Sequence, residues 1–255
     1  MKNKKNGELA VCGYSAVKAI EIKNPDKIKR LYFSNKRVTQ FSQLCKTLAS
    51  IKRPYNLVDD ADLEKLSDSV HHQGVVAMIE KPEIPLLDKE TITEWLHSKE
   101  DVILMDHVGN ANNLGAIIRS AAFFGFKNIV LLSDEANSMI TTSSYRVAQG
   151  AMESVKIYKT ESIVKFLSEM SGKMLRVGTD VSATTPVSQI RKLCAEKNGK
   201  GALVVLGNEE NGISKETKQN CDVLVTIPTK AKLETFDSLN VAQAASVIFY
   251  AMSQG

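Results

Sequence analysis

The apolar residues of this chain follow two patterns, and the way these patterns alternate predicts an α/β protein. Five short apolar runs after residue 100 are almost uninterrupted, which is typical of strands buried on both faces. Between them, apolar residues recur every three or four positions, as in amphipathic helices. The runs lie at 102–105, 129–132, 174–177, 203–206 and 223–227, with helices expected at 163–170, at 187–194 and after residue 240. We therefore expect a parallel sheet that helices cover on both faces.

The first eighty residues predict a smaller unit of the same α/β class. The expected strands are 28–33, 55–58 and 74–79, and the expected helices are 14–20, 38–48 and 60–66. The stretch KPEIPLLDKE at 81–90 contains two prolines, which restrict the residues before them and cannot occupy a central strand, so we interpret it as a linker. The expected organisation is a domain at 1–80, a linker and connecting helix at 81–98, and a second domain at 99–255.

The composition argues against several other classes of protein. The four cysteines form no CxxC pair and the four histidines form no HxxxH or HExxH pattern, so we expect free thiols and no metal site. No apolar run approaches the roughly 18 residues that span a membrane, and the start of the chain has no apolar stretch of signal-peptide length. The sequence therefore predicts a cytoplasmic protein without a membrane segment.

Charge is distributed unevenly, although the net charge is only +4. Residues 1–53 hold 13 Lys and Arg against 3 acidic residues, or +10, whereas residues 54–80 hold 1 against 6, or −5. A basic segment on a near-neutral chain indicates a polyanionic partner held through phosphate contacts. A solvated lysine-rich face would give the same count, so both interpretations stay open.

Three motifs lie where strands are expected to end, which is the edge at which open α/β sheets bind ligands. The first is NNLGAIIRSAAFFGF at 112–126. Asp106 closes the strand before it, and Asn113 is expected just ahead of a helix, as its cap. Gly115 leaves room for a ligand near the helix start, and Arg119 presents a planar fork of donors suited to a phosphate. An ordinary capped helix with a surface arginine would have the same sequence.

The second motif, LGNEENGIS at 206–214, directly follows an expected strand. Gly207 would let a cofactor lie against bare backbone, and Ser214 is expected to cap a short helix. A lone GNEENG is a weak signal, because a turn with incidental acidic residues has the same pattern.

The third motif begins with Ile227 and Pro228 at the end of a strand. It resumes with Ser238, Leu239 and Asn240, where Ser238 is the expected cap of the last helix. The alanines of that helix keep it narrow, which suits close packing against another element.

In this order, the three motifs resemble those of the SpoU-type (TrmH-like) RNA ribose methyltransferases of the SPOUT superfamily. The family's NxG followed four residues later by Arg falls on Asn113, Gly115 and Arg119, and its GxExxG glutamate falls on Glu209. The first 80 residues, with HHQGVVA at 71–77, resemble the ribosomal-protein-like RNA-binding domain of many such enzymes. Two features depart from the family: Asn110-Ala111 stands where Asp-Pro is common, and the loop 229–237 is longer and lacks glycine.

The resemblance implies a fold and an activity. The fold is α/β, with a small α/β RNA-binding domain followed by a parallel sheet that ends in a C-terminal deep trefoil knot, and the chain is expected to form a homodimer. The activity is transfer of a methyl group from S-adenosylmethionine to the ribose 2′-hydroxyl of one nucleotide in structured RNA, with rRNA favoured over tRNA. The implied catalytic residues are Asn113, Arg119, Glu209, Ser238 and Asn240, and the implied cofactor-binding residues are Leu206, Gly207, Ile227, Pro228 and Leu239.

The resemblance leaves two roles open for Arg119. The family pattern makes it the catalytic base or its substitute, yet a guanidinium stays protonated in proteins. The other role is to grip a phosphate, orient the ribose and stabilise the developing oxyanion, with the phosphate taking the proton. Asn113 and Ser238 would then position the hydroxyl, while Glu209 and Asn240 would brace the loops.

Two further functions compete with the methyltransferase. A nucleotide-binding oxidoreductase would need a GxGxxG after a strand, and the sequence has none. A catalytically silent RNA-binding protein on the same scaffold is opposed by the retained motif residues and favoured by the altered loop at 229–237.

Overall fold

The computed structural model describes residues 7–197, 199–208, 210–230 and 238–254. Contacts divide the chain into two compact units, each built around its own sheet. Unit 1 comprises Met1–Glu83 together with Ile140–Ser154, and unit 2 comprises Ile84–Met139 together with Val155–Gly255.

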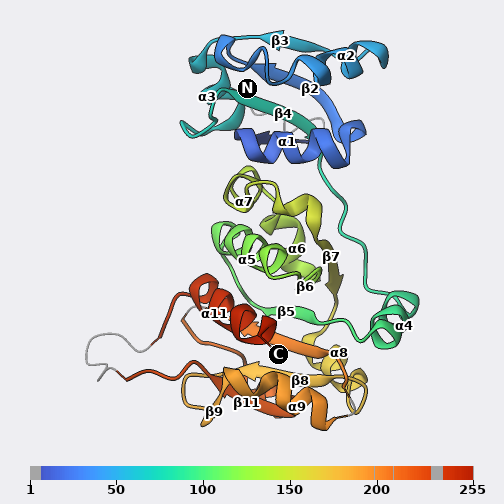
Figure 1. The fold of residues 1–255 in the computed structure, drawn as a ribbon, viewed down its shortest axis with the longest axis vertical. Helices are drawn as coiled ribbons and strands as arrows, with labels where there is room; N and C mark the ends of the chain where they lie inside the picture. The colour runs from blue at the N-terminus through green and yellow to red at the C-terminus, as the bar shows by residue number, and fades with distance from the viewer. Residues whose placement is uncertain (1–6, 198, 209, 231–237, 255) are drawn as a thin grey trace. The chain divides into compact units, whose positions relative to one another are not determined.

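Unit 1 contains a four-stranded mixed sheet (Figure 1) in the order β1-β4-β2-β3. The strands are β1 Glu8–Cys12, β2 Ile28–Phe33, β3 Tyr55–Leu57 and β4 Val75–Glu80, and the helices are α1 Tyr14–Lys23, α2 Ser42–Ser50, α3 Asp60–Ser67 and α7 Thr142–Ala148. β4 runs antiparallel to β1 and β2, whereas β3 is parallel to β2. The carboxyl ends of β1, β2 and β3 and the amino end of β4 therefore share one edge, which we call the unit-1 loop edge.

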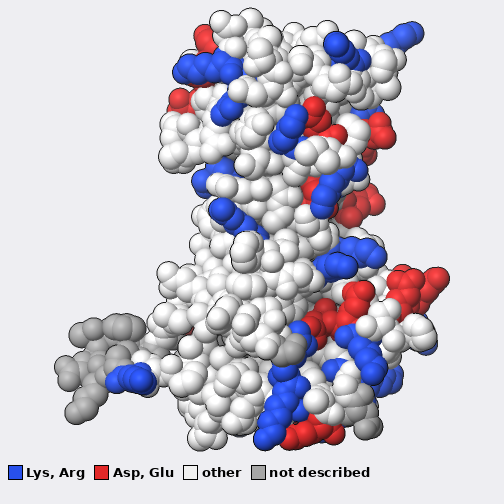
Figure 2. Space-filling view, viewed as in Figure 1, with Lys and Arg blue, Asp and Glu red and all other residues white. Residues whose placement is uncertain are grey.

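The charge of unit 1 is more evenly spread in space than in sequence. On the face drawn in Figure 2, lysine and arginine side chains are interspersed with acidic ones rather than gathered in one continuous patch. Several cations of the basic segment form ion pairs with acids from outside it, including Lys27 with Glu153 and Lys29 with Glu80. The +10 of residues 1–53 is thus partly neutralised by folding.

Unit 2 contains a seven-stranded sheet (Figure 1) in the order β7-β6-β5-β10-β8-β11-β9. All of its strand pairs are parallel, as the unbroken apolar runs predicted. The strands are β5 Val102–Asp106, β6 Asn128–Leu132, β7 Lys156–Thr160, β8 Leu175–Thr179, β9 Thr185–Pro186, β10 Ala202–Gly207 and β11 Val223–Thr226. The helices are α4 Lys89–Ser98, α5 Ala111–Phe123, α6 Ser133–Met139, α8 Ile163–Glu169, α9 Ile190–Glu196, α10 Lys215–Gln219 and α11 Val241–Ser253.

The core of unit 2 explains why helices cover both faces of this sheet. One face packs on α4 and α8 through a cluster that includes Trp95 and Phe166, and Trp95 meets the Tyr158 ring edge-on at 5.3 Å. Alternate strand residues point to the opposite face, where α5 and α11 lie side by side (Figure 1). Burial on both faces is the reason that the strands read as continuous apolar runs.

The order of the strands creates a switch point beside β5. From β5 the chain continues outward through β6 and β7. The later strands β8, β9 and β11 form the other side of the sheet, where their spatial order is β8-β11-β9. β10 fills the place between β5 and β8, so Gly207 at its end lies opposite Asp106 at the end of β5. Ligands of open α/β sheets bind outside the carboxyl ends of strands at such a point. We call this region the switch edge.

Candidate functional site

The first and third sequence motifs meet at the switch edge. Asn240 donates a hydrogen bond from Nδ2 to Oδ1 of Asn113 at 3.3 Å, across 127 positions of sequence. The two asparagines stand at the starts of α11 and α5, which also share a hydrogen bond between the hydroxyls of Ser120 and Ser246 at 2.7 Å. Two implied site residues are therefore in direct contact.

Both helix caps differ from those expected. Asn110, not Asn113, caps α5, because its side chain accepts the Asn112 N–H at 2.8 Å and the helix begins three residues earlier than predicted. Asn240, not Ser238, caps α11 by accepting the Ala242 N–H at 2.9 Å. The correction matters for the site: since Asn113 lies within the first turn, its amide is not used as a cap and points instead to Asn240.

A network of polar contacts joins the loops after β5 and β10. Asp106 is buried, with 2% of its surface exposed, and its Oδ2 accepts the Ser214 N–H at 3.0 Å. Asn208 accepts two backbone N–H groups of its own loop and donates from Nδ2 to the carbonyl of His107 at 2.9 Å. Ser214 caps α10, as predicted. The second motif is thereby fixed to the end of the β5 strand.

Gly207 is required by the loop itself. A Cβ at this position would lie 2.3 Å from the backbone atoms C of Gly212 and N of Ile213. The loop returns onto the strand end through paired backbone hydrogen bonds between Asn208 and Gly212. The sequence-based argument that the bare backbone faces a cofactor is therefore not needed to explain this glycine.

Arg119 is exposed on α5 and has no hydrogen-bond or ion-pair partner within the described ranges 7–197, 199–208, 210–230 and 238–254. At 3.6 residues per turn, Asn112, Gly115 and Arg119 occupy one side of the helix. Asn113 lies about a third of a turn away on the same helix. The guanidinium of Arg119 is exposed and can therefore bind a ligand from solvent.

The remaining implied residues differ in exposure. Leu206 is buried in β10, and Ile227 is partly buried just after β11. Pro228, Ser238 and Leu239 are exposed, and Leu239 shows 46% of its surface. Glu209 and the loop residues 231–237, including Lys232 and Glu234, lie outside the described residues.

Sequence reasoning missed His107 and its partner Glu135. His107 follows β5 with a left-handed φ of 57°, and its Nδ1 lies 2.8 Å from Oε1 of Glu135 at the start of α6. Its Nε2 lies 3.7 Å from Oδ1 of Asp106. The signal available in the sequence was a histidine directly after a strand-closing aspartate, which we weighed only as a metal ligand.

Asp180 at the end of β8 was also missed. Its carboxylate forms an ion pair with Lys218 of α10 at 2.6 Å and accepts two hydrogen bonds from Ser182. Burial alone would raise the pKa of Asp180, but the hydrogen bonds from Lys218 and Ser182 outweigh it and lower the pKa to about 2. Because β8 lies between β10 and β11, this carboxylate braces the middle of the switch edge.

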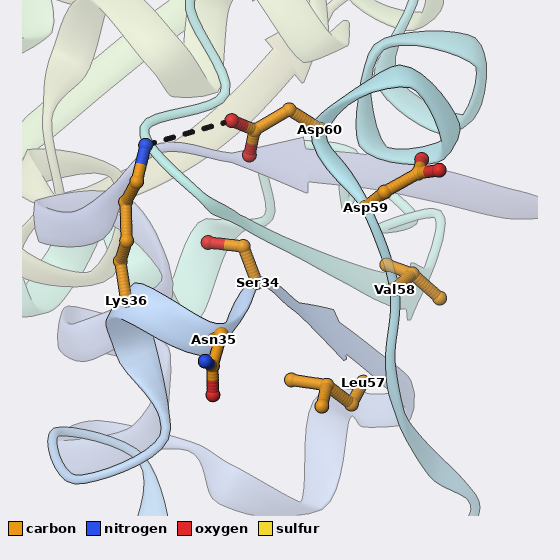
Figure 3. Close-up of a pocket in the computed structure, with 7 residues that line it drawn as sticks. All are labelled: Ser34, Asn35, Lys36, Leu57, Val58, Asp59 and Asp60. Carbon is orange, nitrogen blue, oxygen red and sulfur yellow. Dashed lines mark ion pairs between the residues drawn. The ribbon is translucent and has the colours of Figure 1, made fainter.

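A pocket of about 550 Å³ lies elsewhere, on the unit-1 loop edge (Figure 3), and none of the implied site residues lines it. Ser34, Asn35 and Lys36 line it from the turn after β2, and Lys36 faces Asp60 at 3.7 Å. The other lining residues are Leu57, Val58 and Asp59.

No group of three or more His, Cys, Asp or Glu side chains among the described residues is placed to hold a metal ion. None of the helices in the described part of the chain has the length and apolar character to cross a membrane. All four cysteines are free thiols, as their spacing predicted.

Solved structures share this fold. The SpoU methyltransferase AviRb from Streptomyces viridochromogenes, in complex with AdoMet, aligns over 100% of this chain and 93% of its own, with a TM-score of 0.73 and 22% identity. An AdoMet-bound rRNA methyltransferase from Sinorhizobium meliloti aligns over 98% of this chain and 88% of its own, with a TM-score of 0.75 and 19% identity.

Sequence comparisons identify the family. A protein described as the 23S rRNA (guanosine-2′-O-)-methyltransferase RlmB of Coxiella burnetii is 30% identical over 246 residues, which are 94% of this chain and 93% of the relative. An uncharacterized tRNA/rRNA methyltransferase of Haemophilus influenzae is 26% identical over 97% of this chain and 67% of the relative. The family model for RNA 2′-O ribose methyltransferase substrate binding matches residues 10–85, and the model of the SpoU rRNA methylase family matches residues 100–250. The chain belongs to the SpoU rRNA methylase family.

Proposed function

We propose that this RNA methyltransferase transfers a methyl group from S-adenosylmethionine to the ribose 2′-hydroxyl of a nucleotide in ribosomal RNA. The observation that carries the proposal is the hydrogen bond between Asn113 and Asn240, since it joins two motifs at the switch edge, and the exposed Arg119 lies on the same helix as Asn113. The relatives described as 23S rRNA guanosine 2′-O-methyltransferases support a guanosine of 23S rRNA as the first substrate to test.

The residues at the switch edge fit the proposed cofactor in their chemistry. Leu239 exposes an apolar side chain just before α11, and Ile227 is only partly covered. Such surfaces suit the apolar face of an adenine ring. Backbone of Leu206, Gly207 and Pro228 would complete the cofactor contacts. When bound, S-adenosylmethionine supplies an electrophilic methyl group.

The chain's own residues must activate a poor nucleophile, because a ribose hydroxyl has to lose its proton as it attacks. Arg119 stays protonated and cannot serve as an ordinary base. It instead binds the neighbouring phosphate so that this phosphate takes the proton of the hydroxyl, and it orients the ribose and stabilises the developing negative charge on the oxygen. Asn113, held by Asn240, positions the hydroxyl together with Ser238, and Glu209 braces the loop after β10.

We assign RNA binding to residues 1–80 and chemistry to residues 99–255, joined by the linker and helix at 81–98. The match of residues 10–85 to a substrate-binding family model supports this division. The positive charge at the start of the chain also supports it.

The functional form that we propose is a homodimer, with the α5–α11 face as the contact. Phe123 and Tyr250 expose 83% and 56% of their surfaces there, and Phe124 meets both rings edge-on at 5.1 and 6.2 Å. An exposed aromatic cluster of this kind is typical of a protein interface. A second copy of the chain fits this face because a two-fold contact would place both clusters together.

Two measurements test the proposed function. Calorimetry should detect binding of S-adenosylmethionine, and 2′-O-methyl mapping of total RNA should find one site that is methylated only in cells that carry the gene. Transfer RNA serves as the comparison substrate in the purified reaction. Cofactor binding without methylation of any RNA would favour a catalytically silent RNA-binding protein, and a modification found on a base rather than a ribose would contradict the proposed chemistry.

A further inference from the structure

Arg37 of unit 1 combines a fixed position with the lack of a carboxylate partner among the described residues. Lys18, Lys27 and Lys29 each form an ion pair within 3 Å of a carboxylate. Arg30 pairs with Glu8, and Arg53 donates to backbone carbonyls. Arg37, in contrast, has no carboxylate partner among the described residues of the chain.

Arg37 is nevertheless held in place. Its guanidinium lies over the ring of Tyr14, 4.7 Å from the ring centre, and its Nε donates to the backbone carbonyl of Gln73 at 2.9 Å. Phe41 supports Tyr14 from the side, with the two ring centres 5.8 Å apart. The stack and the hydrogen bond fix the plane of the guanidinium but leave Nη1 and Nη2 without an acceptor in the part of the chain that the structure describes.

The backbone around Arg37 is shaped for this arrangement. Gln73 adopts a left-handed φ of 52°, which is costly for a residue with a side chain, and its Oε1 accepts the Tyr14 N–H at 2.9 Å. Gly74 has a φ of 79°, and a Cβ there would lie 2.7 Å from the Ser34 hydroxyl and 3.2 Å from Cγ of Arg37. The turn that supplies the carbonyl to Arg37 therefore packs directly on the arginine.

The order of strands indicates on which side of Arg37 an anion would lie. Along the unit-1 loop edge, Tyr14 follows β1, Gln73 precedes β4, Arg37 follows β2, and Asp59 and Asp60 follow β3. The two acids border the pocket on the β3 side (Figure 3), where they would repel a phosphate. An anion is favoured on the side of Tyr14 and Gln73.

We propose that Arg37 binds a phosphate of the RNA substrate through its two terminal nitrogens, with Tyr14 and Gln73 holding the guanidinium ready. A planar fork of donors matches two phosphate oxygens, and a side chain that is already fixed loses little freedom on binding. Contacts of this kind set the position of an RNA without reading its sequence. The inference rests on the proposed function, in which unit 1 holds the RNA.

The test is RNA binding by the full chain, measured by fluorescence anisotropy over a salt series with a labelled 23S rRNA fragment that the wild-type protein methylates. Arg37→Ala should weaken binding by roughly tenfold or more and lower the slope of log K against log salt by about one. Arg37→Lys should recover little of the loss, because lysine lacks the fork. Tyr14→Leu keeps the charge and removes the stack, so it should weaken binding by about threefold or more.

The matched control is Lys46→Ala, which removes one exposed charge from α2 of the same unit. It should change binding by less than about twofold. Equal RNA affinity for Arg37→Ala and Lys46→Ala would overturn the inference. The proposed function would stand in that case, provided that the wild-type protein methylates the RNA. A wild-type chain that methylates no RNA would instead remove the proposed function, and an unchanged melting temperature excludes misfolding as the cause of any loss.

Discussion

The side-chain amide of Asn240 uses both of its ends. Its oxygen caps α11, and its nitrogen donates to Asn113 of α5. Asp has no side-chain donor, and Ser and Thr would have to accept and donate at the single oxygen of a shorter side chain. A position that sequence analysis treated as a loop brace is therefore both the start of a helix and the contact between two motifs.

This double role predicts different outcomes for two variants of Asn240. Asn240→Ser keeps a capping oxygen, so the free energy of unfolding should fall by only a few tenths of a kcal/mol, while methylation should fall because Asn113 loses the hydrogen bond from the Asn240 amide. Asn240→Ala should lose the same activity and also about 1 kcal/mol of stability. Urea unfolding and initial rates separate the two effects, and full activity in the Ser variant would show that the bond to Asn113 has no catalytic importance.

Arg119 permits a test of the proposed chemistry. Arg119→Ala should reduce the methylation rate by roughly two orders of magnitude or more, as does the loss of an oxyanion donor. Binding of S-adenosylmethionine, followed by calorimetry, should change little, because the proposed cofactor contacts lie on the loops after β10 and β11. Arg119→Lys should rescue little if two phosphate oxygens are bound together. Near-normal turnover in the Ala variant would remove Arg119 from the mechanism.

Asp180 links the stability of the switch edge to pH. Its folded pKa of about 2 lies below the usual value of about 3.9, so its contribution is fully present above about pH 4 and is lost as the pH falls through the folded pKa. Lys218→Met should raise the pKa of Asp180 measured by carboxyl NMR and lower stability at pH 7 by about 1 kcal/mol. The stability difference between variant and wild type should shrink between pH 4 and pH 2, and a constant difference would contradict the assignment.

At the scale of elements, the loop between β10 and α10 requires glycine at position 207. Gly207→Ala would place a Cβ against backbone atoms, which cannot rotate away as a side chain can. We therefore expect the free energy of unfolding, measured by heat or urea, to fall by about 1 to 3 kcal/mol. Gly109→Ala is the matched control, since a Cβ there would meet nothing within 4 Å. Equal stability of the two variants would mean that the loop 208–214 moves without cost.

The pattern of apolar residues predicts the buried central strands better than the edge strands and short helices. The central strands β5, β6, β8 and β10 were predicted within a residue or two, because burial on both faces leaves an unbroken apolar run. β7 was missed, because Lys156 and Lys159 leave only two consecutive apolar residues in this edge strand. β1, α6 and α7 were missed as well.

The sequence proposes residues for the candidate site but does not predict how they are arranged. Asn113 and Asn240 were both expected in the site, yet their contact depends on where two helices begin, and each cap was predicted at the wrong residue. A change of two or three residues in a helix start is below the resolution of capping patterns, since several Asn and Ser residues compete at each end. His107 and Asp180 depend on partners 28 and 38 positions away, which no local pattern encodes.

For the whole molecule, the exposed aromatic cluster on α5 and α11 predicts self-association. Light scattering at micromolar concentration should give about twice the chain mass of 28.0 kDa. Phe123→Glu should shift the protein to the single-chain mass, whereas Ile22→Glu, at a 70% exposed apolar residue of α1, should not. A single-chain mass for the wild-type protein would contradict the proposed dimer.

The knot implied by the family resemblance stays a prediction. The position of α7 bears on any truncation experiment, because residues 140–154 belong to the same compact unit as the start of the chain and α7 packs on β1. Removal of the first eighty residues would uncover the face of α7 that meets β1. Point variants such as those of Arg37 therefore separate RNA binding from chemistry more cleanly than a deletion.

The central place of β10 in its sheet has a consequence for synthesis on the ribosome. Asp101, just before β5, accepts the backbone N–H of Ala202, the first residue of β10, from 101 positions away. Until β10 emerges, β5 and β8 each present a free edge to other chains, and β10 must still fill the place between them. A nascent chain that stalls before residue 202 should accordingly be a client of chaperones and proteases rather than a smaller folded protein.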